Sequence, residues 1–351
     1  MKLTHYFLTS MLFLIGLILS PSAIHSQDKK PKKISLMDHL LTEDLPTLTI
    51  QTNVNKVFAD YKIQNYYWGN ATLSFDGEEQ IQEEIQVKTR GKFRSRYCEN
   101  PPIKIKFSNK SLKAQNFKKL NEFKIVYPCK SKEEHQNYVY KEYLIYKLYN
   151  VLTENSLRAQ LVDITLVDSA ATIADRNFKG FLIEDREELV KRMKGVTDGL
   201  ECMPPDNLSQ YDYTLFQVFQ YFIGNTDWLL PTCKNAEIIL LKDGKMIPIP
   251  YDFDFAGMVN TNYASPDLGL GVTSVTQRLF LGHLKTMEEL NPVLTLFQAK
   301  KSALIQVIND FEYLPAKDRK KMIKYLESFY KIIKKSKNVT KVFVHPIAEK
   351  G

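Results

Sequence analysis

Five short oxygen-bearing side chains follow strongly apolar segments between residues 223 and 257. They occur in "IGNTDWLLPTCKN" and "IPIPYDFDFAG", and they are Asn225, Asp227, Asn235, Asp252 and Asp254. Carboxylate and amide oxygens suit a magnesium ion that is shared with phosphates, because the ion takes one or two carboxylates and leaves its other positions to phosphate and water. A neighbouring carboxylate can accept the proton of an attacking hydroxyl. The stretch therefore indicates phosphate chemistry assisted by a metal ion.

Asp252 and Asp254 are separated by one residue at the end of an apolar run. Strand alternation would send both carboxylates to the same face. Two like charges on one face repel unless a cation or hydrogen-bond donors lie between them. Either residue alone could form a turn or a helix cap. Together they predict a pair that needs a cation.

The residues "GNTDW", "KN" and "IPYDFD", taken in this order, resemble the catalytic segment of the spore coat protein H (CotH) kinase family and, more distantly, that of HipA-type and other atypical kinases. The resemblance implies Asp227 as the catalytic base, Asn235 and Asp252 as metal ligands, and Asp254 as a second acid near the metal. Asn225 would support the loop. ATP and Mg²⁺ are the implied cofactors, and a protein hydroxyl is the implied acceptor.

The same resemblance implies a lysine and a glutamate earlier in the chain. Lys124 lies on the expected strand "EFKIVYP" and precedes Glu142 on the next expected helix, which is the order of the lysine and glutamate pair in kinases. The segment "GFLIED" takes the place of the strand between the lobes, so Glu184 and Asp185 are expected near the adenine.

A basic segment, "VKTRGKFRSRYCENPPIKIKF", also resembles part of the family's N-lobe. Its rival candidates for phosphate contact are Arg90, Lys104 and Lys106. For Arg94 and Arg96, membership of a basic loop held by Cys98 is at least as good an interpretation. Aromatic residues lie nearby, but no recognised nucleic-acid module surrounds the cluster, so no nucleic-acid partner is expected.

Hydrophobic periodicity predicts the elements that must position these residues. Alternating segments predict strands at 47–54, 71–77, 81–91, 101–110, 121–129, 160–169 and 178–186, with a turn at Asp76-Gly77. Helical spacing marks 137–152, 211–224, 292–311 and 317–335, and a hairpin turning at Asp243-Gly244 is expected within 235–255. In the first helix, Tyr140, Tyr143, Leu144 and Leu148 form one stripe.

The expected fold class is α+β, with the two lobes of a protein-kinase-like fold. A β-rich N-lobe would run from 46 to 186, and a mainly helical C-lobe with the inserted β-hairpin from 187 to 345. Residues 27–45 read as a polar tether. Residues 1–26 read as a secretory signal peptide, because an apolar run follows Lys2 and ends in small residues. The protein is therefore expected to be exported, periplasmic or extracellular, with no membrane span after signal removal.

Four cysteines remain in the mature chain, and in an oxidising compartment they are expected to form disulfides. Three pairings are possible. The pairs Cys98 with Cys129 and Cys202 with Cys233 are preferred, because each closes a loop within one half of the chain.

The composition is that of a globular protein, with 351 residues, 44% hydrophobic residues and a net charge of +8. The positive charge suits anionic partners without selecting one. A catalytically inactive kinase-like module for envelope binding or adhesion shares every feature above. A metal-dependent glycosyltransferase using Asp-x-Asp is a second alternative, although no doubly wound α/β pattern precedes the motif. A glycosidase could be built from Asp227 and Asp252.

Overall fold

The computed structural model of this chain describes residues 33–75, 79–196, 202 and 208–344. The predicted signal peptide, the first six residues of the predicted tether (27–32) and the turn at Asp76-Gly77 lie outside the described residues. Among the helices that are described, none is both long enough and apolar enough to cross a membrane.

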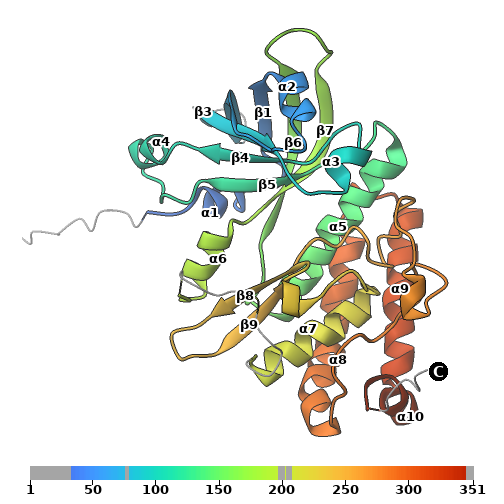
Figure 1. Cartoon of the computed structure of the whole chain (residues 1–351). Coiled ribbons are helices and arrows are strands. Elements are labelled where there is room, and N and C mark those ends of the chain that lie inside the picture. The colour runs from blue at the N-terminus through green and yellow to red at the C-terminus, as the bar shows by residue number, and fades with distance from the viewer. Residues whose placement is uncertain (1–32, 76–78, 197–201, 203–207, 345–351) are drawn as a thin grey trace, which may run out of the picture. The chain divides into compact units, whose positions relative to one another are not determined.

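Seven strands in the first half of the chain close into a barrel (Figure 1). The order around the barrel is β1-β2-β3-β4-β5-β7-β6. All neighbours are antiparallel except β1 and β6, which run parallel and close the barrel. The bounds are β1 Thr47–Thr52, β2 Tyr67–Phe75, β3 Glu79–Thr89, β4 Ile103–Phe107, β5 Glu122–Val126, β6 Ala159–Asp168 and β7 Arg176–Ile183.

The prediction of a two-lobed protein-kinase-like fold is wrong, although the mixture of strands and helices is as expected. The strands form a closed seven-stranded barrel, whereas a kinase N-lobe is an open sheet. Closure depends on the parallel pairing of β1 with β6, in which Ile50 lies opposite Leu166. Alternation identifies each of these strands but does not say which strands pair, so the sequence could not reveal the closure.

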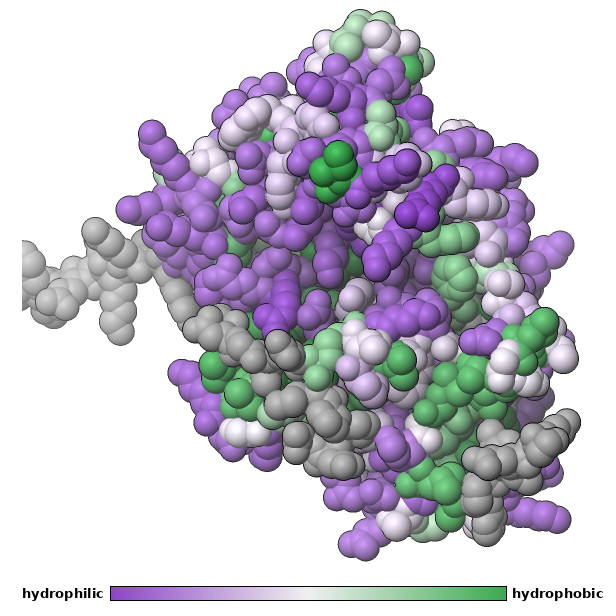
Figure 2. Space-filling view, in the orientation of Figure 1, coloured by the Kyte–Doolittle hydropathy of each residue, from purple (hydrophilic) through white to green (hydrophobic). Residues whose placement is uncertain are grey.

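The barrel core is filled by the apolar positions of the alternating strands. In β4, Ile103, Ile105 and Phe107 are buried, and Lys104 and Lys106 between them are half-buried. The surface over the barrel in Figure 2 is accordingly mostly hydrophilic. Alternation along these strands therefore predicted the inward and outward faces correctly.

A short helix, α1 (Leu36–Leu40), lies within the segment predicted as a polar tether. Ser35 and Asp38 form a capping box at its start. Leu36, Met37 and Leu40 are fully buried and belong to the core cluster of the barrel. The tether interpretation therefore does not hold for this part, because its few apolar residues share one face of a capped helix.

The second half of the chain is mainly helical and carries one hairpin, formed by β8 (Ala236–Leu240) and β9 (Met246–Pro250). The stripe predicted for the first long helix is buried along α5. The bounds of the helices are α2 Val54–Ala59, α3 Arg94–Tyr97, α4 Asn109–Ala114, α5 Glu133–Leu152, α6 Arg186–Arg192, α7 Gln210–Ile223, α8 Met287–Asn309, α9 Ala316–Ile333 and α10 Ser336–Val339, followed by a π-helical turn at Thr340–Val344. Helix α5 packs against both β7 and α8, so it joins the barrel to the helical part (Figure 1).

Candidate functional site

The loop that follows α7 is shaped by the way this helix ends. Gly224 ends α7 with a left-handed φ of +68°, and an added Cβ would meet the Tyr325 hydroxyl oxygen at 2.0 Å. A side chain here would be strained and would displace Tyr325. Asn225 is buried; its Nδ2 donates to Gln220 Oε1 at 3.0 Å, and its Oδ1 accepts a hydrogen bond from the backbone N–H of Asp227 at 3.0 Å. Asn225 therefore fixes the position of Asp227 in the loop.

Asp227 and Asn235 are brought together by the tight loop between them. Leu229 and Lys234 exchange backbone hydrogen bonds of 3.1 and 2.9 Å, and Asn235 has a left-handed φ of +53°. Asn235 Nδ2 donates to Asp227 Oδ2 at 2.9 Å and to the Asp227 carbonyl at 2.6 Å, and Lys234 Nζ forms an ion pair with Asp227 Oδ1. Both Asn235 bonds use its nitrogen, so its Oδ1 is the atom that remains for a metal ion.

Asp252 and Asp254 do not lie on a strand. Strand β9 ends at Pro250, and Asp252 has a left-handed φ of +62°. The expectation that strand alternation brings the two carboxylates together is therefore wrong, because the backbone leaves the extended conformation before Asp254. They nevertheless interact: burial and then Asp252 raise the pKa of Asp254 to about 7. The backbone N–H of Asp252 donates to the Tyr146 hydroxyl at 3.0 Å, and the Tyr263 hydroxyl donates to Asp254 Oδ2 at 3.2 Å.

Glu142 of α5 adds a third carboxylate to this group. It is 2% exposed, and its Oε1 makes no hydrogen bond to any residue that the structure describes. Burial, followed by Asp254 and Asp252, raises the pKa of Glu142 well above its usual range. Asp227 is close enough to raise the pKa of Asp254 as well. The group formed by Glu142, Asp227, Asp252 and Asp254, called the acidic group below, is unfavourable unless cations compensate it.

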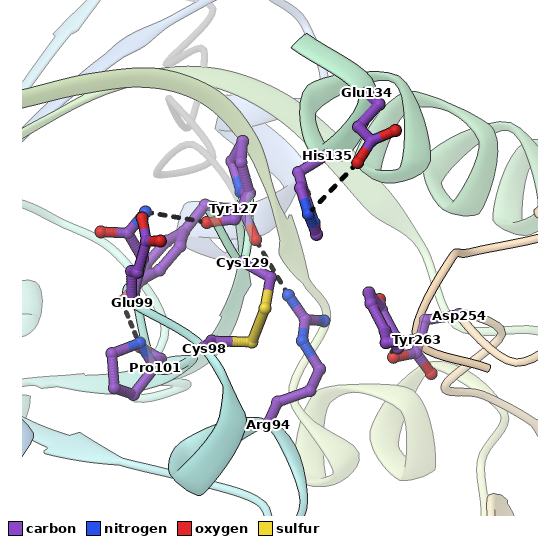
Figure 3. Close-up of a disulfide and its surroundings, with 12 residues drawn as sticks. Arg94, Cys98, Glu99, Pro101, Tyr127, Cys129, Glu134, His135, Asp254 and Tyr263 are labelled. Carbon is purple, nitrogen blue, oxygen red and sulfur yellow. Dashed lines mark hydrogen bonds and ion pairs between the residues drawn. A yellow bond between two sulfur atoms is a disulfide. The ribbon is translucent and has the colours of Figure 1, made fainter. Parts of the chain in front are cut away.

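Arg94 supplies one compensating charge from helix α3. Its Nη2 donates to the Tyr127 carbonyl at 2.9 Å, and Figure 3 shows the guanidinium between that carbonyl and the Tyr263–Asp254 pair. Burial acts to lower the pKa of Arg94, but Tyr263, Asp254 and Glu142 raise it above its ordinary value. Arg94 therefore faces the acidic group as a fixed cation.

Arg90 supplies a second positive charge at the end of β3. Its backbone N–H donates to the Pro102 carbonyl at 2.9 Å, and its guanidinium acts to lower the pKa of Glu142. The Nε atoms of Arg90 and Arg94 are buried and make no hydrogen bond within the described part of the chain. Guanidinium donors held in this way fit the oxygens of a phosphate.

Both disulfides found among the described residues brace this site. The bond Cys98–Cys129 links the segment that carries Arg94 to the segment that follows β5 (Figure 3). The bond Cys202–Cys233 anchors the loop between Asp227 and Asn235. The preferred cysteine pairing is thus confirmed. Disulfides are typical of an oxidising compartment, in agreement with an exported protein.

Lys124 of β5 lies near the acidic group but does not pair with Glu142. Its Nζ lies 3.9 Å from Glu237 Oε1. Burial lowers the pKa of Lys124 below its ordinary value, although the negative charges of Glu237 and Asp252 act to raise it. The Lys124–Glu142 ion pair that the resemblance implied is not formed by these two described residues, and the positive charge of Arg94 acts on Glu142 instead.

The other two lysines proposed for phosphate contact have an acidic partner. Lys104 Nζ forms an ion pair with Glu122, and Lys106 Nζ lies 3.5 Å from Glu122 Oε1. Lys104 is opposite Lys124 in the β4–β5 register. Lys104 and Lys106 therefore share the single carboxylate of Glu122, which balances one of their two charges.

Glu184 and Asp185, predicted to lie near the adenine, have different surroundings. The Glu184 side chain is 0% exposed, and its carboxylate lies 2.9 Å from both Arg158 and Arg192. Its oxygens accept hydrogen bonds from these two guanidinium groups and from the Arg158 backbone, so none is left for a nucleotide. Asp185 caps α6 through the Glu187 backbone N–H at 2.7 Å. Burial raises the pKa of Asp185.

The site fits a magnesium ion only if phosphate and water complete the coordination. Within the described residues, no group of three or more His, Cys, Asp or Glu side chains is arranged to hold a metal ion. Magnesium bound with phosphates needs only one or two carboxylates from the protein. Asp252 and Asp254 can supply these carboxylates, and Asn235 can add an amide oxygen. Glu142, whose Oε1 has no partner among the described residues, belongs to the same group of acids.

Several residues of the site were not predicted from the sequence in these roles. Arg94 was assigned to a basic loop. Its position four residues before Cys98 could have indicated a place near the segment after Lys124, because a disulfide from Cys98 to Cys129 was expected. Tyr146, which accepts from the Asp252 backbone, was assigned no role. Glu237 and Tyr263 likewise carry no sequence signal, because their contacts depend on how distant segments pack.

A scan against protein-family models finds no match for this chain, and a search of curated proteins finds no significant relative.

Proposed function

We propose that this protein is a CotH-like phosphotransferase that moves the γ-phosphoryl group of ATP to a protein hydroxyl in a magnesium-dependent reaction. The observation that supports the proposal is the meeting of acids from three separate segments with two guanidinium groups whose Nε donors are unused. Buried carboxylates with raised pKa values beside fixed cations are frequent at functional sites.

In this proposal Arg90 and Arg94 bind phosphate oxygens through their free donors. Lys124, which interacts electrostatically with Asp252, adds positive charge to the site. Asp252 and Asn235 are the metal ligands, and Asp254 is the second acid. Magnesium, when bound, neutralises charge on the phosphate oxygens and relieves the repulsion within the acidic group.

Asp227 accepts the proton of the attacking hydroxyl. Its carboxylate is held in one orientation by Asn235 and Lys234, and a fixed orientation supports the role of a general base. Glu184 has no part in nucleotide binding here, because two arginines already use its carboxylate.

A catalytically silent module for envelope binding is the second candidate. The pairing of Lys124 with Glu237 favours it, because Glu142 of α5 then does not hold the lysine in the position for phosphate contact. The scarcity of ATP outside cells favours it too. The two candidates differ in phosphoryl transfer and agree in nucleotide binding.

Thermal shift measurements with Mg-ATP test the proposal. The wild type should be stabilised by Mg-ATP and much less by ATP in EDTA, and Asp252→Ala should lose the magnesium-dependent part. At a ligand concentration one hundred times the Kd, binding stabilises by about 2.7 kcal/mol. Asp243→Ala is the matched control, because Asp243 is an exposed acid on the hairpin turn that pairs with Lys245.

Absence of a magnesium-dependent shift in the wild type would end the kinase proposal. Stabilisation by a sugar nucleotide such as UDP-glucose, and not by ATP, would favour a glycosyltransferase. A shift without phosphate transfer to any tested protein would leave the silent module.

A further inference from the structure

A polar cavity of about 270 Å³ opens beside Asp227. Its lining includes Thr226, Asp227, Lys234, Phe255, Asp267 and Val272. Among the residues that line it, Asp227 is the one that also belongs to the acidic group; Glu142, Asp252 and Asp254 do not contribute. A larger cavity, of about 390 Å³, is lined by Arg158 and Arg192, and none of the predicted site residues lines it. Its one link to them is Glu184, which pairs with both arginines. The smaller cavity therefore meets the proposed site at the proposed base.

The walls of this cavity are held by the same glycines that shape the site loops. The Gly257 backbone N–H donates to the Gly224 carbonyl at 2.9 Å, which joins the loop after β9 to the loop after α7. An added Cβ at Gly257 would meet the Val275 carbonyl oxygen at 2.6 Å. Arg278 Nη2 donates to the Tyr325 carbonyl at 2.7 Å and fixes the end of the same wall. These contacts hold the loops that carry the cavity walls.

The charged side chains that line the cavity carry a net negative charge. Lys234 is committed to Asp227 through an ion pair. Asp267 accepts a hydrogen bond from the Gly269 backbone N–H at 2.9 Å, and no cation pairs with it among the described residues. A ligand that places a positive charge near Asp267 would complete this wall.

Exposed leucines lie on both loops that line the cavity. Leu229 is 49% exposed and lies between Asp227 and Lys234 in the chain. Leu268 and Leu270, 75% and 36% exposed, follow Asp267 in the 3-10 turn η3 (Leu268–Leu270). These leucines offer apolar contacts to a ligand that extends out of the cavity.

We infer that this cavity is the acceptor site for an extended polypeptide that carries a serine or threonine, a basic residue next to it and apolar residues beyond. The hydroxyl side chain enters the cavity beside Asp227, the basic side chain meets Asp267, and the apolar residues contact the leucines. The inference rests on the proposed function, since it gives the acceptor of the same reaction.

The chemical step balances without a further reactant. Asp227 takes the hydroxyl proton as the hydroxyl oxygen forms a bond to the γ-phosphorus. The bond from the γ-phosphorus to its bridging oxygen breaks, and the electron pair leaves with ADP.

Peptide binding measured by fluorescence anisotropy tests the inference without requiring turnover. The probes are fluorescein-labelled Gly-Leu-Lys-Ser-Leu-Gly and its relative with glutamate in place of lysine. At low ionic strength the wild type should bind the lysine peptide about threefold more tightly, the size expected for one exposed ion pair. Asp267→Lys should invert the preference, and Asp267→Asn, which keeps the hydrogen-bond acceptor, should abolish it. Asp243→Lys is the control and should keep the wild-type preference.

Equal binding of the two peptides to the wild type, or the same preference in Asp267→Lys, would overturn the acceptor site. No binding of either peptide at about 1 mM, corresponding to about −4 kcal/mol, would overturn it as well. These outcomes are distinct from failure of the proposed function, which appears as a missing Mg-ATP shift.

Discussion

Replacing Asp254 with asparagine should stabilise the protein at pH 8 in the absence of divalent metal. Asp254 is 5% exposed, and burial followed by Asp252 raises its pKa from 3.8 to about 7. The folded-state pKa is above the unfolded value, so the folded state binds the proton more tightly. The contribution of this group to stability is therefore full below about pH 4 and is lost as the pH rises through about 7. Asparagine keeps the shape and the acceptor for Tyr263 but carries no charge.

The size of the effect follows from the difference between the two pKa values. About three pKa units correspond to roughly 4 kcal/mol. Roughly 300 folded residues have an unfolding entropy of about 0.6 kcal/mol/K, so this free energy corresponds to a rise in Tm of about 6 °C. The interaction with Glu142 makes this an upper value, because neutralising either acid relieves the other.

Thermal unfolding in EDTA at pH 5 and pH 8 measures the difference. Asp254→Asn should raise the Tm more at pH 8 than at pH 5, and Asp243→Asn, at the exposed hairpin turn, should change it little at either pH. With Mg-ATP at pH 8 the wild type should gain more than the variant. An equal or lower Tm for Asp254→Asn at pH 8 would refute the reasoning about the acidic group.

Three further predictions concern the framework of the site. Glu184→Gln should lower the Tm by about 5 °C or more, because two half-buried arginines lose the charge of their buried partner at a cost of about 3–5 kcal/mol, while the Mg-ATP shift of the folded protein persists. The double variant Cys98→Ser with Cys129→Ser should lose about 3–4 kcal/mol in urea unfolding and should also weaken the Mg-ATP shift, because Arg94 is no longer braced. An undiminished shift would show that the bond does not position Arg94. Gly224→Ala should destabilise by about 1–3 kcal/mol in the same assay, since alanine is strained at φ +68° and displaces Tyr325; a neutral result would contradict the loop geometry.

The sequence predicted the elements better than their arrangement. Alternation in "IKIKF" identified β4 and its buried face, and helical spacing identified α5, because these patterns are local. The closure of the barrel depends on the pairing of Ile50 with Leu166, and no local pattern encodes a pairing across that distance. Cysteine number and position allowed three pairings, and the preferred one, which closes a loop within each half of the chain, is the one observed.

The candidate site shows the same division. Asp227, Asn235, Asp252 and Asp254 were recognised as chemically unusual because they follow apolar segments. How they meet depends on left-handed residues, such as Asp252 at φ +62°, which a strand pattern cannot indicate. Lys124 was expected to pair with Glu142 but lies near Glu237, and Arg94, on a disulfide-linked segment, is the cation that acts most strongly on Glu142.

Incubation of the purified protein with γ-³²P-labelled ATP and Mg²⁺ tests the central claim most directly. Casein can serve as the acceptor, and Asp252→Ala and Asp227→Asn are the comparison variants. Our account predicts magnesium-dependent label on protein with the wild type and at least a hundredfold less with either variant, or about 2.7 kcal/mol of lost transition-state stabilisation. Equal labelling by the wild type and both variants, or no labelling by the wild type on casein or on itself, would contradict it.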